Sequence, residues 1–201
     1  NPTGLMVLAR QRTIDLDRPV NEYLGAAKLT ARIGDARQAT VRRVANHLAG
    51  LPLHFQFFYY DQPARRPSAD ETIRRYGNIM RVPGEHFNYS NLGYGILSDL
   101  IADQSRQSYA DFMHDAVFAP LGLTHTAVDI PESLKPYAAA RYANDGERLP
   151  FFDTDHAGAS EVYSSAHDLI RFAAFHMKAH LAGQTPILDD ATLDAMHVNA
   201  A

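Results

Sequence analysis

Apolar residues recur every three or four positions through one long stretch in the middle of the chain. The recurring residues are Leu92, Ile96, Leu97, Leu100 and Ile101. This spacing predicts a helix with one buried face, and the Pro83-Gly84 pair ahead of it marks a turn. Gly93 and Gly95 lower the helix propensity of the first turns. We therefore expect another segment of the chain to pack closely against these two glycines.

Residues that favour helix N-termini predict several further helices. Thr40, Ser68, Ser108 and Ser165 each precede an apolar helical pattern. Glu71 follows Ser68 at the spacing of a capping box. The predicted helices cover residues 2–12, 40–48, 68–76, 92–101, 108–119, 165–180 and 190–197. The chain is therefore predicted to be mostly helical.

Aromatic residues gather in one short stretch, residues 55–60, which reads FQFFYY. A strand, a loop plug and a cleft wall all suit this composition, and the sequence leaves the three open. Because this stretch could form a cleft wall, Phe58, Tyr59 and Tyr60 are candidate substrate-binding residues. Farther along, Asn-Asp-Gly at residues 144–146 separates two short alternating stretches, which predicts a hairpin within residues 138–152.

Composition excludes several classes of protein. With 201 residues, of which 46% are hydrophobic, the chain can bury a sizeable core as one large domain or two small ones. A net charge of −4 without a basic block argues against a nucleic-acid partner. The apolar runs fall short of the roughly 20 residues that a membrane span needs. The chain has no cysteine, so disulfides and thiol chemistry are excluded.

Two groups of polar residues could be sites, and we interpret both as structural. His176 and His180 would share one face of the predicted helix, as two zinc ligands can. A methionine stands where the glutamate of a His-Glu-x-x-His motif would be, and no third ligand is marked, so we expect no metal. Asp153, Asp155 and His156 form either a site cluster or a turn cap, and the cap is favoured.

Reactive side chains stand at the mouth of the central helix, in the tripeptide Tyr89-Ser90-Asn91. Residues 83–101, PGEHFNYSNLGYGILSDLI, resemble the second motif region of the penicillin-recognising serine hydrolases. This superfamily of serine β-lactamases and DD-peptidases includes the class C β-lactamases, the penicillin-binding proteins and related esterases. The resemblance implies that Tyr89 shares proton transfer with a lysine and that Asn91 orients the lysine and the substrate amide. Tyr89 and Asn91 are therefore the candidate catalytic residues.

Other segments extend the resemblance along nearly the whole chain. Residues 13–24 and 120–134 are similar to family segments that carry no chemistry, and residues 165–169 match a Ser-x-x-Asp-Leu helix. Residues 41–52 resemble a segment ending His-Thr-Ser-Gly-Leu-Pro, but Leu-Ala replaces Thr-Ser here. We interpret His47 of this segment as a packed structural histidine, with a role in the site as the alternative.

The resemblance covers the middle of a longer enzyme. It implies an α+β fold of the β-lactamase/transpeptidase type, of which this chain is mostly the helical domain, with the antiparallel sheet largely missing. Residues 1–35 would be the end of the nucleophile helix and a loop, residues 36–135 the helical domain with the motif, and residues 136–201 a hairpin and helices returning toward the sheet. The nucleophilic Ser-x-x-Lys would fall just before Asn1, and the Lys-Thr-Gly or His-x-Gly strand beyond the end.

One distance follows from this alignment. Each helical residue advances about 1.5 Å, and the lysine must reach the Tyr89 hydroxyl, so the Cα atom of Asn1 should lie within roughly 10 to 15 Å of the Tyr89 side chain.

The implied parent is a serine hydrolase that forms an acyl-enzyme with an amide or ester. A β-lactam, a D-Ala-D-Ala-like peptide and a short ester are all suitable substrates, and no cofactor is needed. By itself the chain lacks the nucleophile and should be inactive. A non-catalytic penicillin-binding or sensor domain, or a helical interaction domain, is the alternative. The resemblance implies a periplasmic or extracellular location, with any signal peptide upstream of Asn1; the sequence leaves the oligomeric state open.

Overall fold

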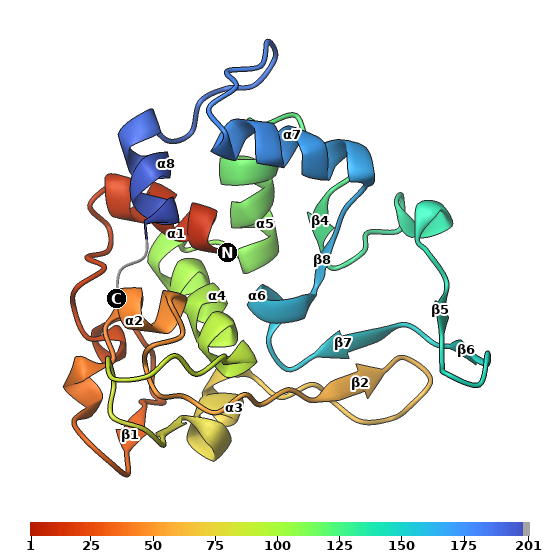
Figure 1. Cartoon of the computed structure of the whole chain (residues 1–201). Coiled ribbons are helices and arrows are strands. Elements are labelled where there is room, and N and C mark those ends of the chain that lie inside the picture. The colour runs from red at the N-terminus through yellow and green to blue at the C-terminus, as the bar shows by residue number, and fades with distance from the viewer. Residues whose placement is uncertain (199–201) are drawn as a thin grey trace.

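The computed structural model describes residues 1–198, in which the helices gather around α4 (Asn91–Ser105) (Figure 1). The other α-helices are α1 (Pro2–Arg10), α2 (Val41–Ala45), α3 (Ala69–Tyr76), α5 (Tyr109–Met113), α6 (Ala157–Ser160), α7 (Ala166–His176) and α8 (Asp190–His197). A π-helical turn at His114–Phe118 continues α5, and short 3₁₀ helices occur at Val20–Glu22, Ala36–Gln38 and Lys135–Tyr137. Among residues 1–198, no helix has both the length and the apolar character to cross a membrane.

The strands of residues 1–198 form only two-stranded pairs. One pair is parallel, β1 (Thr30–Ala31) with β3 (Asn78–Ile79). The antiparallel pairs are β2 (Phe57–Tyr59) with β7 (Phe152–Thr154), β4 (Ala127–Val128) with β8 (Val162–Tyr163), and β5 (Arg141–Tyr142) with β6 (Arg148–Leu149). The predicted hairpin is confirmed as β5–β6, and the aromatic stretch contributes strand β2. This small strand content agrees with an α+β fold of which the chain holds mainly the helices.

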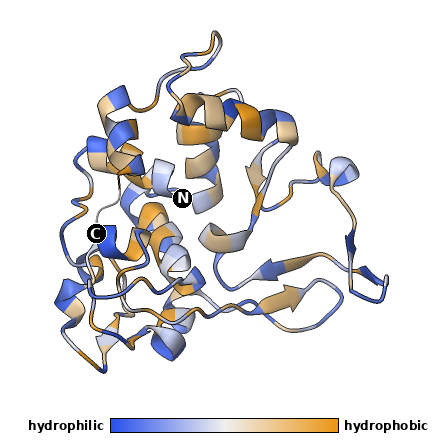
Figure 2. Ribbon diagram, in the orientation of Figure 1, coloured by the Kyte–Doolittle hydropathy of each residue, from blue (hydrophilic) through white to orange (hydrophobic). Residues whose placement is uncertain are grey.

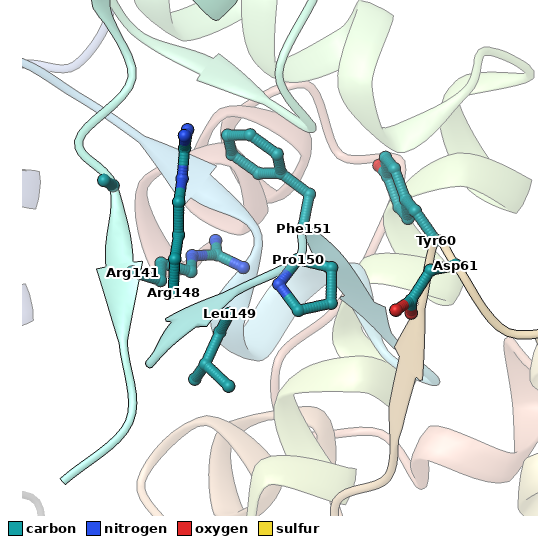
Figure 3. A pocket seen from close by; sticks show the side chains of 8 residues that line it. Tyr60, Asp61, Arg141, Arg148, Leu149, Pro150 and Phe151 are labelled. Atoms are coloured by element: carbon teal, nitrogen blue, oxygen red, sulfur yellow. The ribbon is translucent and has the colours of Figure 1, made fainter. Parts of the chain in front are cut away.

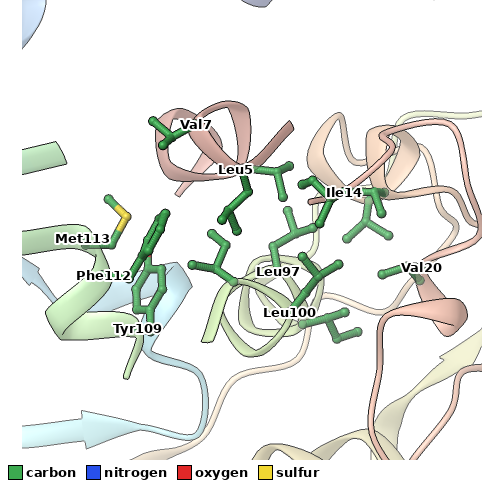
Figure 4. Close-up of a cluster of buried hydrophobic side chains, with 14 of the residues drawn as sticks. Leu5, Val7, Ile14, Val20, Leu97, Leu100, Tyr109, Phe112 and Met113 are labelled. Atoms are coloured by element: carbon green, nitrogen blue, oxygen red, sulfur yellow. The ribbon is translucent and has the colours of Figure 1, made fainter. Parts of the chain in front are cut away.

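The hydrophobic core surrounds the buried face of α4. Leu97 and Leu100 on this helix are completely buried, and Leu5 of α1 and Phe112 of α5 belong to the same cluster of buried side chains (Figure 4). Burial of each such side chain stabilises the fold by about 1.5 to 3 kcal/mol. Figure 2 shows the hydrophobic residues of α4 inside the helical group and hydrophilic residues along the outer loops.

The two glycines of α4 are places of close packing, as the sequence predicted. A Cβ atom added to Gly95 would lie 2.3 Å from the Cβ atom of His156, which immediately precedes α6. At Gly93 the added atom would lie 3.3 Å from Val44 of α2. The absence of a side chain at Gly95 therefore allows α6 to lie directly on α4.

Helix starts were predicted better than helix ends. Thr40, Ser68, Ser108 and Ser165 all accept a hydrogen bond from the backbone N–H three residues later, and the capping box is confirmed. The helix predicted for residues 165–180 was too long, because α7 ends at His176 and the chain then turns through residues with positive φ. The helix predicted for residues 40–48 also ends early, at Ala45.

Candidate active site

Ser90 fixes the start of α4 and so positions its two neighbours. Its Oγ atom accepts a hydrogen bond from the Gly93 N–H at 2.9 Å and donates one to the Pro52 carbonyl at 2.6 Å. Ser90 is therefore the N-cap of α4. Ser90 is 2% exposed and its hydroxyl group already makes two hydrogen bonds, so it is not placed to attack a substrate.

Asn91 is the first residue of α4, and a neighbouring loop holds its backbone. The carbonyl of Leu53 accepts hydrogen bonds from the N–H groups of Asn91 at 2.9 Å and Leu92 at 3.4 Å. On the other side of the tripeptide, the Asn88 side chain donates to the Leu51 carbonyl at 2.5 Å. Residues 51–53 thus run along the tripeptide and fix it from both ends.

Tyr89 projects its ring outward, and 54% of its surface is exposed. The centroid of the His47 ring lies 4.5 Å from that of Tyr89, and the His47 ring also stacks on the Tyr94 ring at 4.8 Å. The His47 Nδ1 atom accepts the Ser90 N–H at 3.2 Å. Burial lowers the pKa of His47, which keeps this nitrogen free to accept. His47 therefore packs as expected and also supports the motif residues.

A buried carboxylate holds the next part of the same loop. The Oδ2 atom of Asp155 lies 2.5 Å from His54 Nε2, and its Oδ1 atom lies 3.0 Å from His156 Nδ1. Burial alone would raise the pKa of Asp155, but hydrogen bonds from His156 and His54 lower it to about 2. Asp155 also accepts the Gln56 N–H at 3.1 Å. It therefore joins two distant segments, and the favoured interpretation as a turn cap was wrong.

The aromatic candidates Phe58 and Tyr59 lie on β2, and Tyr60 follows directly after it. Phe58 is buried, whereas Tyr60 is 55% exposed and lines an open pocket of about 470 Å³ with Arg141, Arg148 and Phe151 (Figure 3). Tyr59 packs on Phe152, and its own ring is outside the pocket lining. Tyr89 and Asn91 do not line this pocket either. The structure thus brings Tyr89 and Asn91 together and associates Tyr60 with another surface, and substrate binding by Phe58, Tyr59 and Tyr60 stays a prediction.

Asp129, Asp153 and Glu161 have carboxylate oxygen atoms within 4.8 Å of one another, which is close enough for a shared metal ion. Two of them have protein partners, because Tyr60 donates to Asp153 at 2.9 Å and Arg66 donates to Glu161 at 3.2 Å. Burial, together with the hydrogen bond and charge of Glu161, raises the pKa of Asp129 to about 7. We interpret Asp129 and Glu161 as a pair of carboxyl groups that share one proton.

Asp129→Asn should stabilise the protein at pH 8 by about 1 to 2 kcal/mol and have much less effect at pH 5. A carboxyl group whose pKa is raised on folding contributes its stability below its unfolded pKa, near 4, and loses it as the pH rises through 7. The asparagine amide is uncharged at every pH, as the protonated carboxyl group of Asp129 is. Urea unfolding at the two pH values measures the difference. Asp61→Asn, on the exposed loop after β2, is the matched control; equal effects of both changes would contradict the prediction.

The helices around α4 and the Tyr89-Ser90-Asn91 motif at its start define the structural class of the chain. A class C β-lactamase structure superposes with a TM-score of 0.75, at 20% identity, over 97% of this chain and 52% of that one. The chain thus has the β-lactamase/transpeptidase-like fold.

The Beta-lactamase family model matches residues 3–201, and the chain belongs to this family. It is 26% identical to a β-lactamase of Providencia stuartii over 87% of this chain and 44% of the relative. It is 24% identical to the putative penicillin-binding protein PbpX of Bacillus subtilis over 85% of this chain and 42% of the relative. The chain thus spans less than half the length of these two relatives.

Proposed function

We propose that the chain is the part of a serine hydrolase that carries the tyrosine and asparagine of the active site. The enzyme would form an acyl-enzyme with an amide or ester, such as a β-lactam, a D-Ala-D-Ala-like peptide or a short ester. The observation that carries the proposal is the geometry of the tripeptide in a chain of the Beta-lactamase family. Tyr89 is exposed, Asn91 begins the central helix, and Ser90 between them is buried and fixed.

Each residue has a role that its placement allows. Acyl transfer needs a nucleophile, a base and donors for the oxyanion. A tyrosine is a good base at neutral pH only where a neighbouring cation favours its phenolate, so we assign Tyr89 to proton transfer in partnership with a lysine. The Asn91 side chain would orient that lysine and the substrate amide. His47 and Ser90 are positioning residues, since they hold the tripeptide without projecting toward solvent as Tyr89 does.

The lysine and the nucleophile would come from a segment ahead of α1. No Ser-x-x-Lys occurs in the 201 residues. The Asn1 side chain donates to the Tyr94 carbonyl at 2.8 Å, and the Tyr94 ring stacks on the same His47 ring that contacts Tyr89. This series of contacts supports a start of α1 close to Tyr89, as the proposal requires.

Covalent labelling of a longer form of the protein, which includes the residues ahead of Asn1, tests the function. A fluorophosphonate or penicillin should add one acyl or phosphonyl mass to a serine upstream of α1. The 201-residue chain is the matched control, and we expect no adduct on it and no hydrolysis of nitrocefin or p-nitrophenyl esters. An unlabelled long form would favour a non-catalytic binding or helical interaction domain. Labelling of a serine within residues 1–201 would contradict the placement of the nucleophile.

A further inference from the structure

We propose that His176 and His197 form a binding site for a divalent metal ion that prefers imidazole ligands, such as Zn²⁺. His176 is the last residue of α7 and His197 is the last residue of α8. The two helices are separated by a long loop, and their C-terminal ends converge at this pair. Neither histidine belongs to the Tyr89-Ser90-Asn91 tripeptide or to the three-carboxylate group.

The distance between the two imidazoles suits a shared ion. The Nδ1 atom of His176 lies 3.2 Å from the Nε2 atom of His197. Two nitrogen ligands at about 2.0 to 2.1 Å from a tetrahedral zinc ion are about 3.3 to 3.4 Å apart. The two nitrogen atoms are within hydrogen-bond distance of each other, so an ion would replace that bond after the rings turn toward it, and water would complete its coordination.

The surroundings of His176 are those of a metal-binding histidine. Such a histidine usually donates its second ring N–H to an oxygen atom, which fixes the tautomer. The Nε2 atom of His176 lies 3.1 Å from the Oγ1 atom of Thr3, which is 3% exposed on α1. The rings of Phe172 and Phe175 pack against His176, with centroid distances of 4.6 and 5.4 Å, and hold its orientation.

Charge also favours a cation between the two histidines. The C-terminal end of a helix carries a partial negative charge, and here two such ends meet. His180, the partner that the sequence spacing suggested, instead lies beside Asp190, with its Nε2 atom 3.3 Å from a carboxylate oxygen. In the structure, His176 therefore pairs with His197 of α8 rather than with His180.

Thermal unfolding of the protein without a histidine tag, with and without ZnCl₂, tests the site. At a hundredfold excess over the dissociation constant, zinc should raise the melting temperature by about 5 °C or more, whereas MgCl₂ should not. His197→Gln should abolish the zinc-induced rise. This side chain is exposed, so the variant is expected to fold normally.

A matched histidine distinguishes this site from others. His180→Gln removes an exposed histidine four residues from His176 and should keep the full response to zinc. Isothermal titration should show one zinc ion per chain in the wild type and in His180→Gln, and none in His197→Gln. An equal response of the wild type and His197→Gln would place the ion elsewhere and overturn the proposal. A wild type that binds no zinc would overturn it as well.

Discussion

Gly95→Ala is expected to destabilise the protein by about 2 to 3 kcal/mol, although alanine normally favours a helix interior over glycine by about 1 kcal/mol. The new Cβ atom would lie 2.3 Å from the Cβ atom of His156 and 3.2 Å from its Cγ atom. His156 cannot yield easily, because its ring is buried beside Asp155 and bonds to the His54 carbonyl at 3.0 Å. The substitution must therefore push α6 away from α4.

Gly93→Ala provides the control in the same helix. Its added atom would meet Val44, Ser90 and Leu51 at 3.3, 3.5 and 3.6 Å, which needs only a small adjustment. Helix propensity should then dominate, so this variant is expected to be neutral or more stable by up to about 1 kcal/mol. Urea unfolding of both variants measures the difference. If Gly95→Ala were as stable as Gly93→Ala, the close approach of α6 to α4 would be incorrect.

Tyr89→Phe should lower kcat by about 10²-fold or more in a longer form of the protein that hydrolyses a substrate, because a positioned general base contributes about that much. The change removes only the hydroxyl group. The phenylalanine ring can keep its contact with His47, so stability should change little. Steady-state kinetics with the best available ester or β-lactam substrate, together with thermal unfolding, give the two measurements.

The control for this experiment is another exposed tyrosine. Tyr142 on β5 is 63% exposed, and Tyr142→Phe should leave kcat and KM unchanged. A kcat that stays the same in Tyr89→Phe would show that Tyr89 serves only in packing. A fall in both kcat and the melting temperature would point instead to a structural role of the hydroxyl group.

Local signals in the sequence predicted a large part of this fold. The capping serines and threonine, the periodicity of α4 and the Asn-Asp-Gly turn depend on residues within four positions of one another, so a single sequence displays them. Helix ends were harder to predict. After α7 the chain turns through positive-φ residues such as Lys178, where the sequence has no glycine or proline to mark the end of the helix.

The supports of the site could not be predicted, because their partners are far apart in sequence. His54 and Asp155 are 101 residues apart, and Ser90 and His47 are 43 apart. Only the fold brings such groups within hydrogen-bond distance, whereas Tyr89 and Asn91 were found from a short motif. The proton-sharing role of Asp129 likewise depends on Glu161, which reaches it by the pairing of β4 and β8.

The contacts of Asn1 also bear on when α1 can gain its native surroundings. Its side chain bonds to the carbonyls of Tyr94 and Gly158, which follow it by 93 and 157 residues. During synthesis α1 emerges before α4 and α5, so its apolar face stays uncovered until those two helices have been made. Such distant contacts slow folding, since the chain must close long loops before they form. Helix α1 therefore gains its native contacts long after it has been made, and its apolar face needs protection until α4 and α5 follow.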